Sequence, residues 1–436
     1  MTDHIDPDDC GCSEYRELSR RQFVGEAAGI SGAVAAAAVF PEWLPRIVLA
    51  ESFAGERDVI VSIFQRGGAD GLNLCVPFGD PGYYTGRTSL AIPGPDASAP
   101  ANQKVTALDN FFGFAPAMTP LIPAFASGNL LVMHATGQSY VSRSHFDAQR
   151  FMEVGKPADV TLVTGWLGRH LSLVPPLRSD APLRALGLAN GLQKSLVGAP
   201  KTLPIANPAN FSIGGAANTQ AARQAVISAD YAAASAPLNT SALDAINTIA
   251  LLQAVDFNGY APMNGAAYPN TSFGRALKSV ATLIQADIGI EAAQVDIGGW
   301  DTHAAQGGVT GALSTLTDNF AASLAAFHAD IVATNARVTV VVISEFGRNV
   351  RENGSQGTDH GRATTMFAMG QGIAGGRVLV NSWPGLAIEN LEKSQDLKVT
   401  LDYRDVLAEI VQNRLGNTQI DQVFPGWNAT FRGVTL

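Results

Sequence analysis

The chain has 436 residues and a formal net charge of −9, with 46% hydrophobic and 15% charged residues. This much apolar sequence excludes an intrinsically disordered chain, and the length is sufficient to bury a large core. The negative charge argues against nucleic acid as a partner, because binding to phosphates needs a basic surface.

The first 50 residues have the pattern of an export signal. They contain the twin-arginine motif Ser19-Arg20-Arg21-Gln22-Phe23-Val24, an uncharged stretch over residues 27–40, and a small-residue cleavage site at Val48-Leu49-Ala50. The uncharged stretch has 14 residues, which is too few to span a bilayer comfortably. We therefore expect a twin-arginine signal peptide over residues 1–50 and the twin-arginine translocase as the partner during export. The mature protein is expected to be periplasmic or secreted, with no stable membrane span.

Residues 51–436 are predicted to form a single domain. Continuous apolar runs predict buried strands at residues 59–64, 130–134, 294–297, 338–343, 364–369 and 377–380. Helices are predicted at residues 117–127, 144–154, 270–286 and 402–414. Residues 157–260 are interrupted by proline and asparagine and then become alanine-rich. We expect this region to form a cap or insertion beside the sheet.

Residues 294–343 give the clearest local pattern. Between two short apolar strands, hydrophobic residues recur at three- and four-residue steps, as in an amphipathic helix: Val309, Leu313, Leu316, Phe320, Leu324, Phe327 and Ile331. Such a βαβ unit has parallel strands and an almost invariably right-handed crossover. The expected fold class is α/β, with three α/β/α layers around a mostly parallel central sheet.

Side chains capable of binding metal or acting as nucleophiles follow four of the predicted strands. Asp70 follows the first of them, Ser144 the second, Asp301 and His303 the third, and Glu345 the fourth. The carboxyl ends of parallel strands share one edge of the sheet, and open α/β sheets form their sites there. These loops are therefore expected to converge on one polar pocket.

The acids and histidines among these residues point to a metal site. Asp301 and His303 are two residues apart, so their side chains point the same way in an extended segment. Asp70, Glu345 and His360 are expected to supply the remaining ligands. This mixture favours zinc or manganese, with calcium or magnesium favoured only if few histidines bind. For an isolated Asp-x-His the simpler interpretation is a loop-capping aspartate and a structural histidine.

Ser144 lies at the start of a predicted helix, where two interpretations compete. A serine at a helix N-terminus is usually a cap. It also faces backbone N–H groups that favour an anion, and a nearby metal can make it a nucleophile. Arg143 and Arg348 are predicted to bind the transferred oxyanion as planar forks, although Arg143 can instead pair with Asp147.

Other motifs fail on their context. Residues 370–375 fit the dinucleotide-binding pattern, but a predicted strand follows them where that motif requires a helix. The chain has no Walker A sequence and no Gly-x-Ser-x-Gly elbow, which argues against a serine-hydrolase triad. His134 lies within an apolar run and is interpreted as a core histidine.

Seven motifs together resemble an uncharacterised, twin-arginine-exported bacterial family known as domain of unknown function 1501. They span about residues 58 to 416 and read Arg66-Gly-Gly-Ala-Asp70-Gly71-Leu-Asn, Arg143-Ser144-His145-Phe146-Asp147-Ala-Gln, Gly298-Gly-Trp-Asp301-Thr-His303, Ser344-Glu345-Phe-Gly-Arg348, Glu352-Asn-Gly-Ser355, Gly357-Thr-Asp-His360-Gly361 and Asp402-Tyr-Arg404. That family is similar to the alkaline phosphatase and sulfatase superfamily, whose members use two metals at the carboxyl edge of the sheet.

The resemblance implies an alkaline-phosphatase-like fold and a role for each matching residue. Asp70 takes the place of the aspartate after the first strand, and Ser144 that of the nucleophile. The metal-binding Asp and His pair corresponds to Asp301 and His303, Glu345 to the acid of a later acid–His pair, and His360 to the last histidine.

Two departures from the superfamily pattern bear on the metal sites. Phe346 stands where the superfamily usually has a metal-binding histidine, and the spacing between Asp301 and the following histidine is tighter than usual. Either one metal site is incomplete, or His145 or Asp359 fills it.

The sequence therefore predicts an exported metal-dependent hydrolase acting on a small phosphate or sulfate ester. In this hypothesis Ser144 attacks while Asp70, Asp301, His303, Glu345 and His360 hold divalent metal. The alternative is a catalytically silent secreted binding or scaffold protein that retains the fold and one structural metal. Metal-dependent transfer or isomerisation is a third and weaker alternative, because fold does not fix function.

Overall fold

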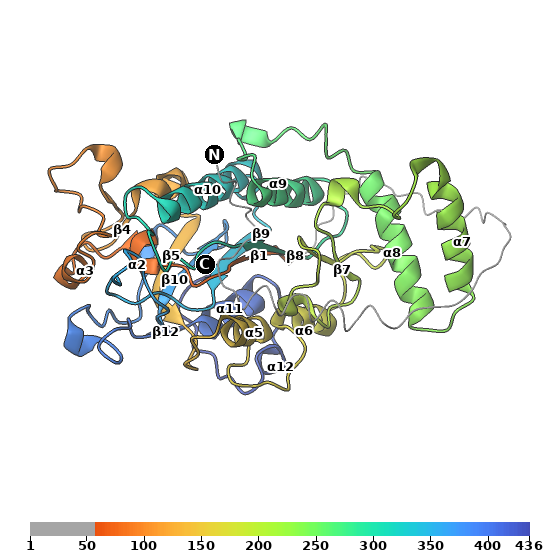
Figure 1. Ribbon diagram of the computed structural model, residues 1–436. Helices are drawn as coiled ribbons and strands as arrows, with labels where there is room; N and C mark the ends of the chain where they lie inside the picture. Colours follow the sequence, from red (N-terminus) through yellow and green to blue (C-terminus); the bar gives the residue numbers. More distant parts are fainter. Residues whose placement is uncertain (1–56) are drawn as a thin grey trace.

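A computed structural model describes residues 57–436 of the chain, and the predicted export signal at residues 1–50 lies outside these residues. The described part is a mixed α/β structure built around one large sheet (Figure 1). Its strands are β1 (Val59–Gln65), β5 (Leu130–Gly137), β6 (Ala185–Gly187), β7 (Thr202–Pro204), β8 (Ala292–Ile297), β9 (Val338–Ser344), β10 (Thr364–Met369), β11 (Arg377–Leu379) and β12 (Leu401–Asp402).

The large sheet is mostly parallel. Within the described residues its nine strands follow the order β11-β5-β10-β9-β1-β8-β6-β7, and β12 pairs with β5. Only β10 runs antiparallel to its neighbours, β5 and β9. The two strands of the predicted βαβ unit are parallel, as expected, but β1 lies between them and pairs with both.

Helices cover both faces of this sheet. The helices are α2 (Gly71–Leu74), α3 (Pro81–Gly86), α4 (Ile122–Ala126), α5 (His145–Val154), α6 (Trp166–Leu173), α7 (Gln220–Ala232), α8 (Leu238–Gln253), α9 (Ser272–Gln285), α10 (Ala312–Phe327), α11 (Tyr403–Asn413) and α12 (Ile420–Val423). Figure 1 shows α9 and α10 on one face, and α5, α6, α11 and α12 on the other.

The side chains of β1 alternate between two buried clusters. Ile60 and Phe64 pack with α6 and α11, whereas Val61 and Ile63 pack with α9 and α10. A strand that is buried on both sides needs a continuous apolar run, because neither face is solvated. This explains why the run at residues 59–64 is so readily recognised in the sequence.

The region at residues 157–260 contributes to the sheet as well as lying beside it. β6 and β7 extend the sheet from β8, while α7 and α8 lie at the far end of the molecule (Figure 1). At the opposite end, β2 (Cys75–Val76), β3 (Thr106–Ala107) and β4 (Gly113–Phe114) form a small three-stranded sheet.

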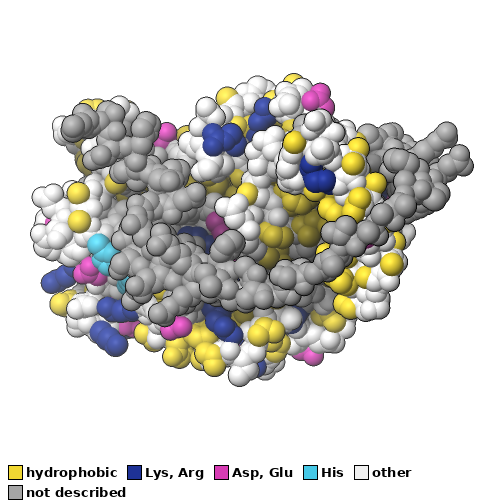
Figure 2. Space-filling model, turned by 45° about the vertical axis from the view of Figure 1, so that its right-hand side comes forward, with side chains coloured by type: hydrophobic (Ala, Val, Ile, Leu, Met, Phe, Trp, Pro, Cys, Tyr) yellow, Lys and Arg dark blue, Asp and Glu magenta, His cyan; other side chains and the backbone are white. Residues whose placement is uncertain are grey.

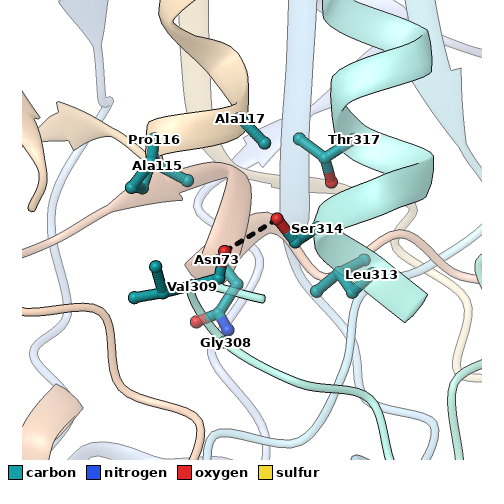
Figure 3. Close-up of a pocket in the computed structure, with 9 residues that line it drawn as sticks. All are labelled: Asn73, Ala115, Pro116, Ala117, Gly308, Val309, Leu313, Ser314 and Thr317. Atoms are coloured by element: carbon teal, nitrogen blue, oxygen red, sulfur yellow. Dashed lines mark hydrogen bonds between the residues drawn. The ribbon is translucent and has the colours of Figure 1, made fainter. Parts of the chain in front are cut away.

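A cavity of about 10 Å³ lies beside α10 (Figure 3). Asn73 and Thr317 are among the residues that line it, and the Thr317 hydroxyl has no hydrogen-bond partner among the described residues. Such a cavity has room for about one water molecule. None of the predicted site residues lines it.

Figure 2 shows how charged side chains are distributed on one face of the molecule. On the face shown in Figure 2, Lys and Arg side chains occur in several separate places among acidic and uncharged ones. Among the described residues, no helix is both long and apolar enough to cross a membrane.

The structure places His134 in the core as a neutral imidazole. Its Nε2 lies 2.9 Å from the Cys75 carbonyl oxygen, and its Nδ1 accepts a hydrogen bond from the Ala135 N–H at 2.8 Å. Burial lowers its pKa from an ordinary value of 6.5 to about 4.

The buried His134 is expected to make folding stability depend on pH. Between about pH 6.5 and pH 4 the unfolded chain takes up a proton that the folded chain excludes, so stability is lost as the pH falls. In His134→Gln, the free energy of unfolding should depend less steeply on pH than in wild type, by up to about 1.4 kcal/mol per pH unit. Denaturant unfolding at pH 7 and pH 5 measures the free energy of unfolding of wild type and variant. If this free energy changed equally with pH in the two proteins, the prediction would be contradicted.

Candidate metal centre

Three of the loops that follow strands begin at the same level of the sheet. Gln65, the last residue of β1, lies opposite Ile297 of β8 and Ser344 of β9. The loops after these residues therefore leave the sheet side by side at its carboxyl edge. His360 reaches this edge from the opposite direction, because it precedes the antiparallel strand β10.

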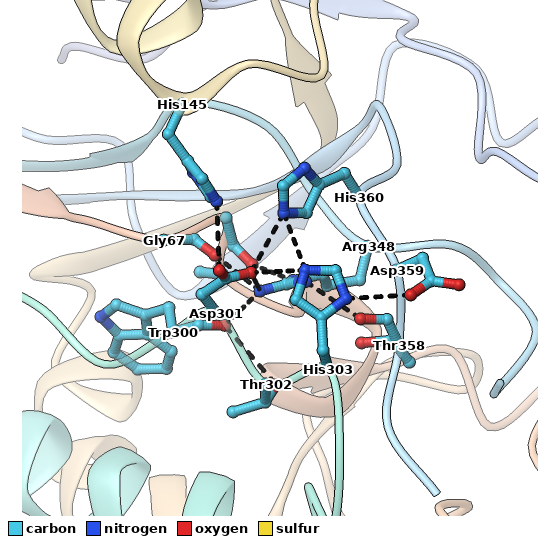
Figure 4. A network of polar contacts seen from close by, with 12 residues as sticks. Gly67, His145, Trp300, Asp301, Thr302, His303, Arg348, Thr358, Asp359 and His360 are labelled. Carbon is cyan, nitrogen blue, oxygen red and sulfur yellow. Dashed lines mark hydrogen bonds and ion pairs between the residues drawn. The ribbon is translucent and has the colours of Figure 1, made fainter. Parts of the chain in front are cut away.

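Three imidazoles and one carboxylate converge at this edge (Figure 4). The Nε2 atoms of His303 and His360 lie 2.9 and 3.0 Å from Asp301 Oδ1, and 3.0 Å from each other. His145 Nε2 lies 3.4 Å from Asp301 Oδ2. His145, Asp301 and His360 offer ligand atoms that all lie within 4.8 Å of one another.

Each of these histidines is oriented through its other ring nitrogen, Nδ1. The acceptors are Glu345 Oε1 at 2.7 Å for His145, Asp359 Oδ1 at 2.9 Å for His303, and the Arg143 carbonyl oxygen at 2.7 Å for His360. Carboxylates and carbonyls only accept hydrogen bonds, so each Nδ1 carries the hydrogen. In each neutral ring the Nε2 lone pair then points into the cluster, which is how metal-binding histidines are held.

The cluster fits a cation. The Nε2 lone pairs of His303 and His360 face each other at 3.0 Å, which is unfavourable unless a positive charge lies between them. His145 Nε2 is buried and forms no hydrogen bond within residues 57–436. Three imidazoles and one carboxylate suit zinc better than calcium or magnesium, which prefer oxygen ligands.

The charges around the cluster also favour a cation. Burial raises the pKa of the Asp301 carboxyl, but contacts with His145 and His360 and the Arg348 charge hold it well below its usual range. Burial lowers the pKa of His145, yet Asp301 and Glu345 together raise it to about 9. Both carboxylates therefore remain negative near neutral pH and favour a positive charge at this edge, either a proton on His145 Nε2 or a metal ion that takes the place of this proton.

Glu345 lies behind the cluster and supports it. This fully buried carboxylate accepts hydrogen bonds from His145, from Gln149 Nε2 at 2.9 Å and from the Gly67 N–H at 2.8 Å. Burial raises its pKa, and the hydrogen bonds from His145 and Gln149 lower it to about 2. Gly67 has a φ of +121°, and a Cβ there would lie 2.7 Å from Asp301 N, so the close approach requires glycine.

The position of Glu345 gives a testable expectation. Glu345→Gln keeps the size of the side chain but weakens the charge-assisted bond that orients His145. Loss of such a supporting carboxylate typically lowers metal affinity about 10–100-fold. Competition with a zinc chelator measures the affinity, while the bound zinc at saturation should stay the same. Complete loss of zinc would instead make Glu345 a direct ligand.

Asp70 does not join the imidazoles. Its carboxylate is fully buried and forms a two-pronged ion pair with Arg87, at 2.5 and 2.8 Å. It also accepts a hydrogen bond from Gln306 Nε2 at 2.7 Å. Of the five predicted metal ligands, the structure thus brings Asp301, His303 and His360 together, whereas Asp70 and Glu345 bind protein groups.

The two predicted substrate-binding arginines also bind protein groups. Arg348 is almost fully buried and donates to Asp301 Oδ1 at 2.6 Å and to the carbonyl oxygens of Gly67 and Gly68. Arg143 pairs with Asp396 Oδ2 at 2.7 Å, whereas pairing with Asp147 was the sequence-based alternative. The Arg143 side chain nevertheless remains 39% exposed, so solvent reaches it.

Ser144 is the residue that precedes α5, as predicted. Its backbone is extended, and its side chain makes no capping hydrogen bond to the helix. No hydrogen bond therefore supports the interpretation of Ser144 as a helix cap. The next residue, His145, is part of the imidazole cluster.

Phe346 packs against the cluster at the position where a superfamily histidine was expected. Its ring centroid lies 4.9 Å from that of His145 and 4.8 Å from that of His360. Sequence reasoning left His145 only as a possible substitute ligand. The spacing of His145 and Gln149 by one helical turn, which puts both on one face of α5, was the available signal.

Comparison with known proteins identifies a family. The model of the family described as protein of unknown function (DUF1501) matches residues 57–423. No curated protein matches the chain. The crystal structure of the C-terminal periplasmic domain of EcEptC from Escherichia coli, a complex with Zn, covers 73% of this chain and 74% of its own at 11% identity, with a TM-score of 0.31. A TM-score this low carries no argument about fold or function.

Proposed function

The chain belongs to the family of proteins of unknown function DUF1501, and we propose that it is an exported metal-dependent hydrolase of phosphate or sulfate esters. The observation that carries the proposal is the set of three imidazoles whose Nε2 atoms converge on Asp301. We attribute this set to a site for one zinc or similar transition-metal ion, held by His145, Asp301, His303 and His360. The alkaline-phosphatase-like fold and export through residues 1–50 are parts of the proposal that rest on the sequence.

A single ion fits the described residues better than two. Asp70 is neutralised by Arg87, and Glu345 is fully buried and accepts hydrogen bonds at both carboxylate oxygens, so we assign neither to a second ion. When bound, a divalent metal supplies Lewis acidity and lowers the pKa of a nearby hydroxyl. Ser144, next to His145, is the proposed nucleophile, and the exposed Arg143 is the proposed binder of the ester oxyanion.

Ester hydrolysis by the purified mature protein tests this function. With zinc or manganese added, the protein is expected to hydrolyse p-nitrophenyl phosphate or p-nitrophenyl sulfate. Ser144→Ala should lower kcat at least about 1000-fold while bound metal stays constant, because removing a nucleophile has effects of this size. Ser172→Ala, which removes an exposed hydroxyl of α6 that donates to the Arg169 carbonyl oxygen, is the control and should retain most activity. Activity that survives in Ser144→Ala would remove this residue as nucleophile.

The catalytically silent alternative is favoured by one observation. Phe346, rather than a metal-binding histidine, packs on the rings of His145 and His360. A metal-loaded wild type with no turnover of either ester would support a binding or scaffold protein with a structural metal. Transfer or isomerisation chemistry would then need other substrates to be tried.

A further inference from the structure

The four groups of the candidate metal centre are not held equally firmly. Side-chain exposure is 5% for His145, 7% for Asp301 and 17% for His360, but 44% for His303. Buried Glu345 orients His145, buried Arg348 holds Asp301, and a backbone carbonyl orients His360. The Nδ1 partner of His303 is Asp359, which is itself 51% exposed.

The geometry of His303 also differs from that of the other three. His145, Asp301 and His360 offer ligand atoms that all lie within 4.8 Å of one another, whereas His303 is not in this group although its Nε2 lies 2.9 Å from Asp301 and 3.0 Å from His360. In Figure 4 the His303 ring enters the cluster from a different side than His145. Catalytic zinc sites have three firmly held protein ligands and a fourth position for an exchangeable group. Structural zinc sites typically have four fixed protein ligands.

The backbone at His303 is fixed although the ring is exposed. Asn353 Nδ2 donates to the His303 carbonyl oxygen at 2.9 Å, and also to Asp359 Oδ1 at 3.1 Å. Gly357 packs so closely that a Cβ there would lie 2.3 Å from the His303 carbonyl carbon. Movement of this side chain therefore requires rotation about its own bonds and loss of the hydrogen bond between His303 Nδ1 and Asp359, while the backbone of the loop stays in place.

We propose that His303 is a displaceable ligand. It occupies the fourth position in the resting protein and yields that position to an anionic oxygen of a tetrahedral oxyanion such as phosphate. One coordination bond to His303 Nε2 breaks and one bond to oxygen forms, without any change of oxidation state. This inference rests on the proposed metal site and adds how that site admits its ligand.

Displacement has a measurable consequence in binding. An anion that competes with His303 binds only to those molecules whose fourth position is open. Its apparent affinity is therefore its intrinsic affinity multiplied by the fraction of such molecules. Removing the His303 ring should therefore strengthen phosphate binding while weakening metal binding only moderately. Removing a firm ligand such as His145 should instead remove the metal.

The experiment uses the mature protein loaded with Co²⁺, whose visible absorption reports coordination. In wild type, titration with inorganic phosphate is expected to change the spectrum saturably. His303→Ala should still bind one Co²⁺ per chain, with affinity lowered no more than about 100-fold, and should bind phosphate at least tenfold more tightly. His303→Gln serves as a second variant of similar polarity, and His328→Ala as a histidine control distant in sequence.

Three results would overturn the inference. Loss of Co²⁺ from His303→Ala as complete as from His145→Ala would make His303 a permanent ligand. Unchanged phosphate affinity in both His303 variants would show that this residue does not compete. Failure of wild type to bind Co²⁺ would reject the proposed metal site as well, which distinguishes that failure from the first two.

Discussion

Replacing His145 with alanine is expected to abolish tight binding of zinc. The imidazole is buried, its Nδ1 is fixed by Glu345, and its Nε2 forms no hydrogen bond within residues 57–436 but lies 3.4 Å from Asp301 Oδ2. We expect zinc affinity to fall at least about 1000-fold, which corresponds to about 4 kcal/mol. Zinc per chain, measured by elemental analysis after dialysis, checks the result.

A second histidine serves as control for this substitution. His328 is also nearly buried and bonds to Asn129 through Nε2 at 3.1 Å, but it takes no part in the cluster. His328→Ala should therefore retain one zinc per chain even if it unfolds more easily. If His145→Ala kept its zinc as well, the imidazole cluster would not be the metal site.

Replacing Arg87 with methionine is expected to destabilise the fold strongly without removing the metal. Arg87 and Asp70 are both fully buried, and the pair is joined by two short contacts. Breaking one partner of a buried pair leaves an uncompensated charge, at a typical cost of about 3–5 kcal/mol. Denaturant unfolding measures the free energy, and elemental analysis should still find zinc in the folded fraction.

The matched control for Arg87 is a cation in an exposed pair. Lys156 lies 3.0 Å from Asp159 and is 39% exposed, so solvent screens this pair. Lys156→Met should leave the unfolding free energy nearly unchanged. If Arg87→Met lost zinc while it remained folded, the Asp70–Arg87 pair would not be independent of the metal site, contrary to this prediction.

The buried strands were accessible to sequence reasoning because their cause is local. β10 coincides with the predicted run at residues 364–369, and β9 extends the run at 338–343 by a single residue. A strand covered on both faces is mostly apolar, with only a few buried hydroxyl residues here such as Thr364 and Thr365, and this pattern is visible without knowledge of its neighbours. The parallel direction followed from the long helical connection between the two strands, so the shared edge was predictable too.

The groups that the site's carboxylates contact could not be predicted from the sequence in this way. Asp70 follows a strand exactly as a ligand should, yet Arg87 reaches it from a proline- and glycine-rich segment with no readable period. Glu345 leaves its strand beside the cluster but points to His145 and Gln149 of α5. Which of several nearby groups a carboxylate meets depends on side-chain packing between segments, which are 17 residues apart for Asp70 and Arg87 and 200 residues apart for Glu345 and His145.

The sequence alone determined the family, the buried strands and the gathering of acids and imidazoles at one edge, because each follows from short motifs or local periodicity. Only the tertiary structure decided that β10 runs antiparallel to its neighbours. The loop that precedes β10 therefore lies at the same edge of the sheet and places His360 there. It also decided that His145 replaces two predicted acids in the cluster. Both outcomes depend on long-range packing, which no window of local sequence contains.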